Sequence, residues 1–496
     1  MCQITIQTGE GTRIVTAGRG RLLGEVLREN IPAFAMPCAG NHTCGKCKVK
    51  VTGAVAAPDE AELRLLSEAE RADGVRLACG CRVEGGVTVT LRAEGTSKIV
   101  SWYETPAFAR TGDGYGFAVD IGTTTVALQL VDRASGRVLA ERLAENAQRG
   151  YGADVISRME ACKEKGVSVL SGRIANQLET MAAECLRETG IPAVSESVVT
   201  GNSTMLHIYE GLDPFPLSVS PFDVQSYFGC VSRRTLAGAP VYLPRCISAY
   251  VGADIVCAVL AADLLSGGVQ LLADIGTNGE MVLARNGNLL CCSTAAGPAF
   301  EGAGLSCGMP AAPGAVRAVK LENGTAVFET VGGQPARGVC GSGILDALAV
   351  MLETEAIDDS GYLEGDWPVG GSGLAITQKD VRQIQLAKSA VCAGLLTLLE
   401  EENTDAGEVR RFVIAGGFGS TMDFDSGKKI GLFPAALRAR TAFIGNGALG
   451  GAYMLLLNPA LREESERMAR EAAELPLSTS AGFMDAYVDC MSFLEF

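Results

Sequence analysis

The sequence lacks an excess of positive charge. It contains 42 lysine and arginine residues against 57 aspartate and glutamate residues, which gives a formal net charge of −15 at pH 7. A chain with this charge repels nucleic-acid phosphates and anionic lipid headgroups. We therefore expect no nucleic-acid partner and no binding to an anionic membrane surface.

Long uninterrupted apolar runs are also missing. The first residues, MCQITIQTGEGTRIV, lack the basic start and the continuous apolar core of a signal peptide. The apolar stretch IVCAVLAADLLSGG is interrupted by Asp263, well short of the length that spans a bilayer. These absences predict a cytoplasmic protein with no membrane partner.

What the chain does have is length, apolar content and cysteine. With 496 residues and 47% hydrophobic residues, it can bury several cores in about two to four domains. Its 17 cysteines are an odd number spread along the whole chain, and no secretion signal precedes them. Reduced thiols or metal ligands are therefore expected rather than a disulfide scaffold.

One cysteine group is dense. The stretch CAGNHTCGKC holds Cys38, Cys44 and Cys47, with five residues in the first gap and two in the second. A loop with three cysteines and a fourth cysteine from a distant strand is typical of the [2Fe-2S] site of plant-type ferredoxins. Gly40 and Gly45 would let backbone amides turn toward the sulfur atoms. The loop therefore predicts an electron-carrying cluster.

The fourth ligand must come from a second segment. The stretch LACGC offers Cys79 and Cys81, which lie two positions apart and would share one face of a strand. On this reasoning alone, the choice between the two cysteines stays open.

Two other kinds of metal site fit the cysteine and histidine spacing less well than a [2Fe-2S] cluster does. A zinc clip uses close pairs of cysteine or histidine, but only Cys44 and Cys47 form such a pair here. A Rieske centre needs two histidines on one iron, and the chain has only His42 and the distant His207. We expect His42 to be a surface loop residue.

The first part of the chain predicts an α+β domain of the β-grasp type over residues 1–93, followed by a linker at residues 94–114. The linker shows no sustained hydrophobic period and is punctuated by glycine and proline. The expected elements are strands at residues 3–7, 13–17, 46–51 and 86–92 and a helix at residues 21–30.

From residue 115 onward, short β-rich runs alternate with helical stretches, which is typical of α/β folds. FAVDIGTTTVALQLVD at residues 117–132 and LLADIGTNGEMVLAR at residues 271–285 share the order apolar strand, Asp-Ile-Gly-Thr, apolar strand. This weak repeat predicts two related lobes, at residues 115–270 and 271–496.

Each repeat places a carboxylate at the end of a strand and a glycine turn after it. Backbone amides in such turns bind phosphates, and the carboxylate can hold Mg²⁺ through water. A third stretch, RFVIAGGFGST, leaves room for an adenosine against its glycines. The candidate residues are Asp120, Gly122, Thr123 and Thr124 in the first hairpin, Asp274, Gly276, Thr277 and Asn278 in the second, and Gly416, Gly417 and Gly419 in the third stretch.

In this order, the three stretches resemble the phosphate-1, phosphate-2 and adenosine motifs of the superfamily of acetate and sugar kinases, Hsp70 and actin. GVCGSGILDAL and FIGNGALGGAYM resemble its connecting helices. No Walker A pattern occurs, which excludes a P-loop fold. GNGALG at residues 445–450 fits a dinucleotide fingerprint, but no second strand with an acidic end follows it. We expect these glycines to allow close helix packing.

The combination of a [2Fe-2S] domain and an actin-like ATPase in one chain is unusual and restricts the families that the chain can resemble. The chain resembles the reductive activators of corrinoid proteins, and ENAQRGYGADVISRM, TGNSTMLHIYEG, STAAGPAFEGAGLSCGM and ITQKDVRQIQLAKSAVCAG agree with that family. The resemblance to adrenodoxin-like ferredoxins, in which the fourth cysteine follows an apolar and a small residue, implies that the cluster ligands are Cys38, Cys44, Cys47 and Cys79.

The resemblance implies an enzyme that hydrolyses ATP with Mg²⁺ and passes an electron from its [2Fe-2S] cluster to a Co(II) corrinoid protein of a methyltransferase system. Asp120 and Asp274 would bind Mg²⁺ or orient the attacking water. An upstream low-potential donor would reduce the cluster. Larger members carry a further region before the ATPase that contributes to dimerisation. This chain is expected to lack it, so a homodimer is only a possibility.

Three alternatives stay open. They are a small-molecule kinase of the same superfamily, an activator of a radical dehydratase or reductase, and a non-enzymatic electron carrier that senses nucleotide. Ser203 and Thr204 are expected to cap a helix, with contact to the γ-phosphate as the alternative, and His207 is expected to pack within that helix. Glu301, in a glycine-rich stretch, is assigned no role.

Overall fold

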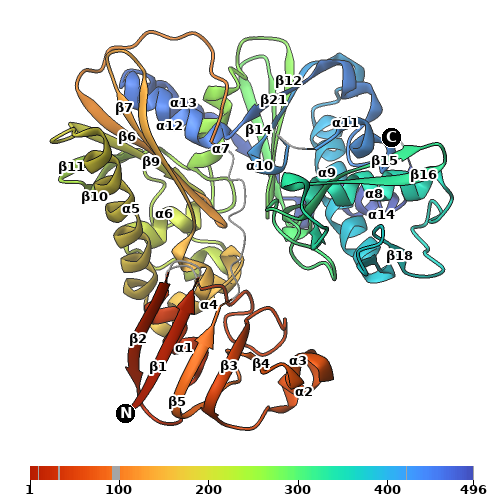
Figure 1. Ribbon diagram of the computed structural model, residues 1–496. Coiled ribbons are helices and arrows are strands. Elements are labelled where there is room, and N and C mark those ends of the chain that lie inside the picture. Colours follow the sequence, from red (N-terminus) through yellow and green to blue (C-terminus); the bar gives the residue numbers. More distant parts are fainter. Residues whose placement is uncertain (9–10, 32–33, 92–100, 420–421, 495–496) are drawn as a thin grey trace.

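The computed structural model describes residues 1–496 except 9–10, 32–33, 92–100, 420–421 and 495–496 (Figure 1). An N-terminal domain lies below two larger lobes, and each lobe is built around its own six-stranded sheet. Within the described ranges, no helix combines the length and apolar character needed to cross a membrane.

The N-terminal domain is a five-stranded sheet in the order β2-β1-β5-β3-β4, with β1 and β5 parallel. Ile4 and Ile6 alternate with exposed neighbours on β1, and Leu23, Val26 and Leu27 of α1 are buried with them. This confirms the α+β β-grasp prediction. Its elements are β1 (Cys2–Thr8), β2 (Gly11–Ala17), α1 (Leu23–Asn30), β3 (Lys48–Val55), α2 (Glu60–Leu65), α3 (Glu68–Ala72), β4 (Val75–Leu77) and β5 (Val83–Thr90).

A buried ion pair joins α2 to β4. Both carboxylate oxygens of Glu62 accept from the Arg76 guanidinium, at 2.8 and 2.6 Å, and one also accepts from the amide of Leu77. Glu62 is 0% exposed. The pair therefore fixes the strand that leads into the LACGC stretch.

We expect Glu62→Gln to lower the free energy of unfolding of this domain by about 3 kcal/mol, because the buried Arg76 charge loses its partner. The measurement is thermal unfolding of the full chain, followed by loss of the cluster's visible absorbance. Asp73→Asn is the matched control, since Asp73 pairs with Lys50 at the exposed surface. Equal shifts in both variants would contradict the prediction.

The first lobe has a sheet in the order β10-β11-β9-β6-β7-β8. Strand β6 is buried along most of its length because α5 and α6 cover one face of the sheet and α12, from the end of the chain, covers the other. Its elements are β6 (Tyr115–Ile121), β7 (Thr125–Asp132), β8 (Val138–Glu145), α4 (Val155–Lys165), α5 (Val167–Thr189), β9 (Glu196–Gly201), α6 (Ser203–Glu210), β10 (Cys230–Leu236), β11 (Ala239–Leu243) and α7 (Ala253–Ala261).

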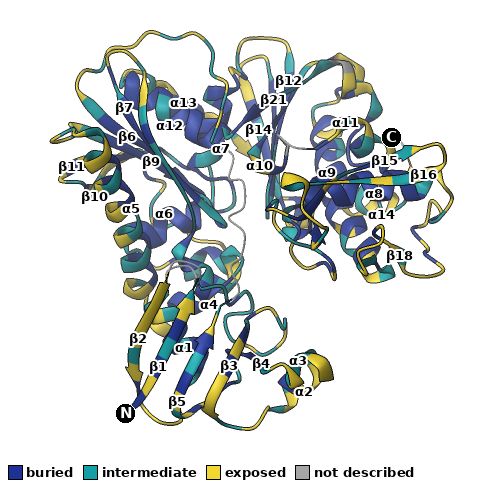
Figure 2. Cartoon of the chain, in the orientation of Figure 1, coloured by how far each residue is buried: buried dark blue, intermediate teal, exposed yellow. Residues whose placement is uncertain are grey.

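The second lobe repeats this plan with a sheet in the order β21-β20-β12-β13-β14-β22 and adds a small sheet, β16-β15-β17, and a ribbon of β18 and β19. The central strands of both lobes are buried (Figure 2). The sheet strands are β12 (Val269–Ile275), β13 (Gly279–Arg285), β14 (Asn288–Thr294), β20 (Val409–Ala415), β21 (Thr441–Gly445) and β22 (Ala473–Glu474). The remaining strands are β15 (Ala315–Glu322), β16 (Thr325–Thr330), β17 (Gly338–Val339), β18 (Trp367–Pro368) and β19 (Ala375–Ile376). The helices are α8 (Gly341–Glu353), α9 (Gln378–Glu401), α10 (Gly416–Gly419), α11 (Phe424–Lys429), α12 (Gly447–Leu457), α13 (Leu461–Glu471) and α14 (Ala481–Asp489).

Helices α7 and α12 cross between the two lobes. Their backbones approach closely, since a Cβ added at Gly451 would lie 2.1 Å from the carbonyl oxygen of Cys257. A Cβ added at Gly447 would lie 3.1 Å from the Cβ atom of Ala258. Within GNGALG, Gly447 and Gly450 therefore serve helix packing, as expected, whereas Gly445 ends β21 against the backbone of Trp102.

The described part of the predicted linker runs against these elements of the second lobe. Tyr103 pairs with Gly445 at the end of β21, and its ring lies 5.4 Å from that of Tyr453 on α12. The amides of Thr111 and Gly112 both donate to the carbonyl of Leu457 at 3.0 Å. The segment is therefore packed along the ATPase lobes.

Candidate functional site

The loop cysteines and Cys79 come from two segments that the first sheet brings together. Cys38, Cys44 and Cys47 lie between α1 and β3, and Cys79 lies in the turn after β4. The amide of Ala78 donates to the carbonyl of Cys47 at 2.9 Å, which fixes Cys79 beside the loop. Cys47 and Cys79 are buried, whereas Cys38 and Cys44 are partly exposed.

The four thiols interact in two pairs. The hydrogen bond between Cys47 and Cys79 lowers the pKa of Cys47 and raises that of Cys79. In the other pair, burial raises the pKa of Cys38, but hydrogen bonds from Thr43 and Cys44 outweigh burial and lower it to about 6. Thiolates are the form of cysteine that binds metal. The hydrogen bonds therefore favour the metal-binding form of one cysteine in each pair, Cys38 and Cys47, whereas burial raises the pKa of Cys44.

Cys81 lies outside this group. The amide of Cys81 donates to the carbonyl of Leu77 at 3.0 Å, so residues 78–80 form a turn. The expectation that Cys79 and Cys81 share a strand face is therefore wrong, because the strand ends at Leu77. Burial raises the pKa of Cys81 to about 11. The charged neighbours that act on its thiol are Arg76, Glu62 and Asp59.

The loop backbone follows the expected pattern. Gly40 and Gly45 have φ angles of +94° and +63°, which favour glycine. The Nδ1 atom of His42 lies 3.2 Å from Oδ2 of Asp59 at the part-exposed surface. His42 thus has a carboxylate partner, in agreement with its interpretation as a loop residue.

The first hairpin joins β6 to β7. Asp120 lies near the end of β6, and its Oδ2 accepts from Nδ2 of Asn446 at 3.0 Å. Burial raises the pKa of Asp120 to about 6. In the turn, a Cβ at Gly122 would lie 2.8 Å from the carbonyl oxygen of the first residue of β7. Thr123 is buried, and its hydroxyl accepts from Nδ2 of Asn202 at 3.0 Å.

The second hairpin has the same construction in the other lobe. Asp274 lies near the end of β12, and burial together with the charge of Asp120 raises its pKa to about 7. The amide of Gly276 donates to the carbonyl of Asn278 at 3.0 Å and closes the turn. The side chain of Asn278 lies 3.4 Å from Oε1 of Glu280. The predicted hairpin residues are thus assembled as two facing turns.

The two motif aspartates belong to a group of four carboxylates, two of which the sequence did not indicate. Glu280 is buried, and the other three are half-buried. Asp254 lies in the first turn of α7, and Glu280 lies on β13. Burial is the largest cause that raises the pKa of Asp254 to about 8, and the negative charges of Asp120 and Asp274 add to it. Burial raises the pKa of Glu280 most, and the negative charges of Asp254 and Asp274 raise it further.

This carboxylate group suits a divalent cation, because a bound cation stabilises the ionised form of buried acids. Mg²⁺ usually binds through one or two carboxylates, several waters and the phosphates of a nucleotide. Among the residues that the structure describes, no three or more His, Cys, Asp or Glu side chains are arranged to hold a metal ion by themselves.

Glu301 is the third acidic residue that the sequence did not assign. Its Oε2 accepts from the hydroxyl of Thr124 and its Oε1 from the hydroxyl of Thr277, each at 2.9 Å. One carboxylate therefore bridges the phosphate hairpins of both lobes. No pattern along the chain could have shown this, because the two partners lie on different hairpins.

The third glycine stretch lies beside the second hairpin. Gly416 has a φ of +87°, and a Cβ there would lie 2.6 Å from Oδ1 of Asp274. Gly417 and Gly419 continue from it in the short helix α10. Only a residue without a side chain fits at Gly416, because the carboxylate of Asp274 and the backbone of Ile275 lie against it.

The helix after β9 begins differently from the expectation. Asn202 is the N-cap of α6, and its side chain accepts from the amide of Met205 at 2.9 Å. Capping by Ser203 or Thr204 is therefore wrong, because both already lie inside the helix. His207 is buried in α6, as expected, and burial lowers its pKa.

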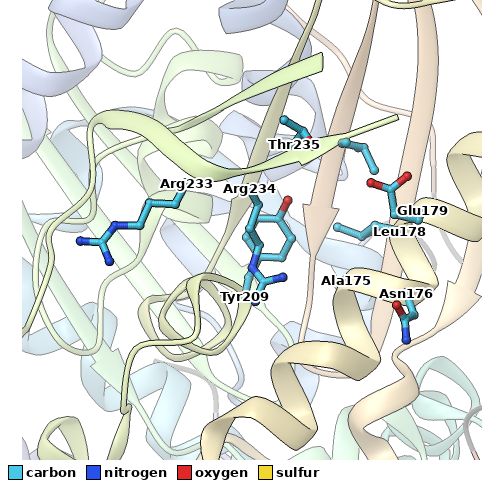
Figure 3. A pocket seen from close by; sticks show the side chains of 9 residues that line it. Ala175, Asn176, Leu178, Glu179, Tyr209, Arg233, Arg234 and Thr235 are labelled. Carbon is cyan, nitrogen blue, oxygen red and sulfur yellow. The ribbon is translucent and has the colours of Figure 1, made fainter. Parts of the chain in front are cut away.

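A cavity of about 310 Å³ lies away from both sites, between α5, α6 and β10 (Figure 3). The guanidinium of Arg234 stacks on the ring of Tyr209 and donates to Ser171, and Arg233 points away from the cavity. None of the predicted site residues lines it.

Comparisons with known proteins agree with these two sites. Residues 6–84 match the family model described as 2Fe-2S iron-sulfur cluster binding domain, residues 115–266 match RACo middle region, and residues 268–495 match C-terminal domain of RACo the ASKHA domain. The corrinoid activation enzyme RamQ of Eubacterium limosum is 32% identical over 413 residues, which cover 75% of this chain and 69% of that protein. The chain belongs to the reductive activators of corrinoid proteins.

Two further members or relatives of this activator family cover most of the chain. The [Co(II) methylated amine-specific corrinoid protein] reductase of Methanosarcina barkeri is 25% identical over 76% of this chain and 77% of its own length. A solved structure described as reductive activator for corrinoid, iron-sulfur protein aligns with a TM-score of 0.69 and 26% identity, over 99% of this chain and 98% of that one. The predicted ferredoxin-plus-ATPase architecture of the activator is thus confirmed.

The middle-region model matches residues 115–266, which begin where the predicted linker ends and form the first lobe. Asp120 and the first hairpin lie within these residues. Strand β6 begins at Tyr115, so the chain passes from the linker directly into the first hairpin, as expected.

Proposed function

We propose that this chain is an ATP-dependent reductive activator that returns a Co(II) corrinoid protein to the Co(I) state used for methyl transfer. The observation that carries the proposal is the joining of a four-cysteine loop to a two-hairpin nucleotide site in one chain, in a family whose relatives are named for corrinoid activation.

Cys38, Cys44, Cys47 and Cys79 would hold the [2Fe-2S] cluster. When bound, such a cluster carries one electron at a potential of about −400 mV. The hydrogen bonds to Cys38 and Cys47 stabilise the thiolate form of these two ligands. A low-potential donor upstream would reduce the cluster. The Co(II)/Co(I) couple lies very low, so the step needs help from nucleotide.

The two hairpins would bind that nucleotide from opposite sides. The hydroxyls of Thr124 and Thr277, which donate to Glu301 in this structure, would hold the phosphates, and the glycine stretch that begins at Gly416 would receive the adenosine. Asp120 and Asp274 would orient Mg²⁺ or the attacking water. Closure of the lobes about α7 and α12 would exclude water and change the affinity for the partner.

The partner would be a corrinoid protein of a methyltransferase system, such as one used in demethylation. The acidic chain gives no support to a nucleic-acid or membrane partner, and we propose that it works in the cytoplasm.

The test mixes reduced protein, Mg-ATP and a Co(II) corrinoid protein without oxygen and follows the absorbance of Co(I). We expect Co(I) to accumulate only when ATP and the cluster-loaded protein are both present. Samples without ATP, or with cluster-free protein, are the controls. Robust phosphorylation of a small metabolite with no Co(I) from any corrinoid partner would favour the kinase alternative instead.

A further inference from the structure

One segment contacts the adenosine stretch, the two hairpins and the cluster loop. Residues 297–309, called here the connecting segment, link β14 to β15 and include the 3-10 helix η3 (Pro298–Glu301). The ring of Phe300 stacks on that of Phe418 in the adenosine stretch, with centroids 4.9 Å apart. The segment therefore contacts the adenosine stretch at the residue just before Glu301.

At the phosphate site, the carboxylate of Glu301 occupies both threonine hydroxyls. Thr124 and Thr277 donate to its two oxygens at 2.9 Å each. A nucleotide phosphate is also an anionic acceptor, so it competes for the same donors and repels the carboxylate. Nucleotide in this site and Glu301 in its present position therefore exclude one another.

At its other end, the connecting segment contacts the cluster loop. Nζ of Lys46, which lies between Cys44 and Cys47, donates to the carbonyl oxygen of Leu305 at 3.5 Å. Only four positions separate Glu301 from Leu305.

The N-terminal domain also contacts the first lobe by a separate route. The guanidinium of Arg28 lies over the ring of Tyr151 at 4.5 Å, and the amide of Ala153 donates to the carbonyl of Pro37 at 3.2 Å. The cluster loop therefore lies between both lobes, and the Lys46–Leu305 contact is its link to the lobe that carries Glu301.

We propose that Glu301 is a positioning residue that couples nucleotide binding to the cluster loop. Phosphates displace its carboxylate from Thr124 and Thr277, the connecting segment shifts, and the Lys46–Leu305 contact opens. The cluster-bearing domain is then released from the second lobe when nucleotide is bound. This inference rests on the nucleotide binding assigned under the proposed function.

The test uses the full-length, cluster-loaded protein and Mg-AMP-PNP, an analogue of ATP that is not hydrolysed. Calorimetry measures its affinity, and amide hydrogen exchange is measured in residues 297–309 and 38–48 with and without the analogue. In the wild type, we expect binding to raise exchange in both segments. A visible spectrum of the cluster checks that each variant is folded.

Glu301→Gln removes the charge but keeps the size of the side chain. We expect it to bind the analogue roughly tenfold more tightly, as if a repulsion of about 1.4 kcal/mol were removed. Exchange in both segments should already be high without nucleotide and should change little on binding. Glu301→Asp keeps the charge but is too short to span both threonines, so it should lose the bridge without gaining affinity. Glu322→Gln, at the exposed end of β15, is the matched control.

Lys46→Met removes the contact between the cluster loop and the connecting segment but leaves Glu301 unchanged. We expect its nucleotide affinity and the response of residues 297–309 to match the wild type, while residues 38–48 no longer respond. Lys50→Met, whose lysine pairs with Asp73 instead, is the control. Analogue binding that leaves exchange unchanged in the wild type, or weaker binding by Glu301→Gln, would overturn the coupling. A failure of the wild type to bind the analogue would overturn the proposed nucleotide function itself, and the coupling with it.

Discussion

We expect the Cys79→Ser variant to be purified without the [2Fe-2S] spectrum, whereas Cys81→Ser keeps it. The thiol of Cys79 shares a hydrogen bond with Cys47, and the charges of Cys47, Cys38 and Cys44 all act on it. The thiol of Cys81 responds to charged side chains of α2 and β4 instead. Loss of Cys79 therefore removes one of four thiolate ligands, and loss of Cys81 removes none.

The measurement is visible absorbance and bound iron after anaerobic reconstitution of each variant. Cys81→Ser is a matched control because it makes the same substitution two residues away in the same turn. It should still lower the free energy of unfolding by roughly 1–3 kcal/mol, because a hydroxyl replaces a thiol at a fully buried position. A cluster retained by Cys79→Ser and lost by Cys81→Ser would contradict the ligand assignment.

Local periodicity was enough to predict the N-terminal domain. The alternation of Ile4 and Ile6 on β1, and the helical spacing of Leu23, Val26 and Leu27, both survive in the structure. The turn at residues 78–80 was missed because a strand and a tight turn look alike over so few residues. The hydrogen bonds from the amides of Gly80 and Cys81 to the carbonyl of Leu77 distinguish the turn from a strand.

The nucleotide hairpins were predictable because they repeat a local pattern, but the residues that complete them were not. Asp254, Glu280 and Glu301 are single acids in separate elements, and only the fold brings them to the hairpins. Asn202 was missed for the same reason, since its contact with Thr123 joins distant parts of the chain. Sequence periodicity carries no signal for such long-range pairs.

The carboxylate group also leads to the second large effect, which is on ATP turnover. We expect Asp274→Asn to lower Mg-ATP hydrolysis by about 100-fold or more, because it removes a charge that faces Asp120 and the phosphate hairpins. An amide of the same size also binds Mg²⁺ more weakly than a carboxylate does. The measurement is phosphate release by full-length protein under saturating ATP.

The free energy of unfolding of Asp274→Asn distinguishes a role of Asp274 in ATP turnover from a role in folding. Burial raises the pKa of Asp274 to about 7, so its charged form costs folding free energy, and Asp274→Asn should be at least as stable as the wild type. Thermal unfolding and the cluster spectrum test this expectation beside the turnover assay. Asp263→Asn, at an exposed position just after α7, is the matched control and should hydrolyse ATP normally. Unchanged turnover in Asp274→Asn would show that the two hairpins do not act together on one nucleotide, whereas lost turnover with unchanged or increased stability assigns the charge to catalysis.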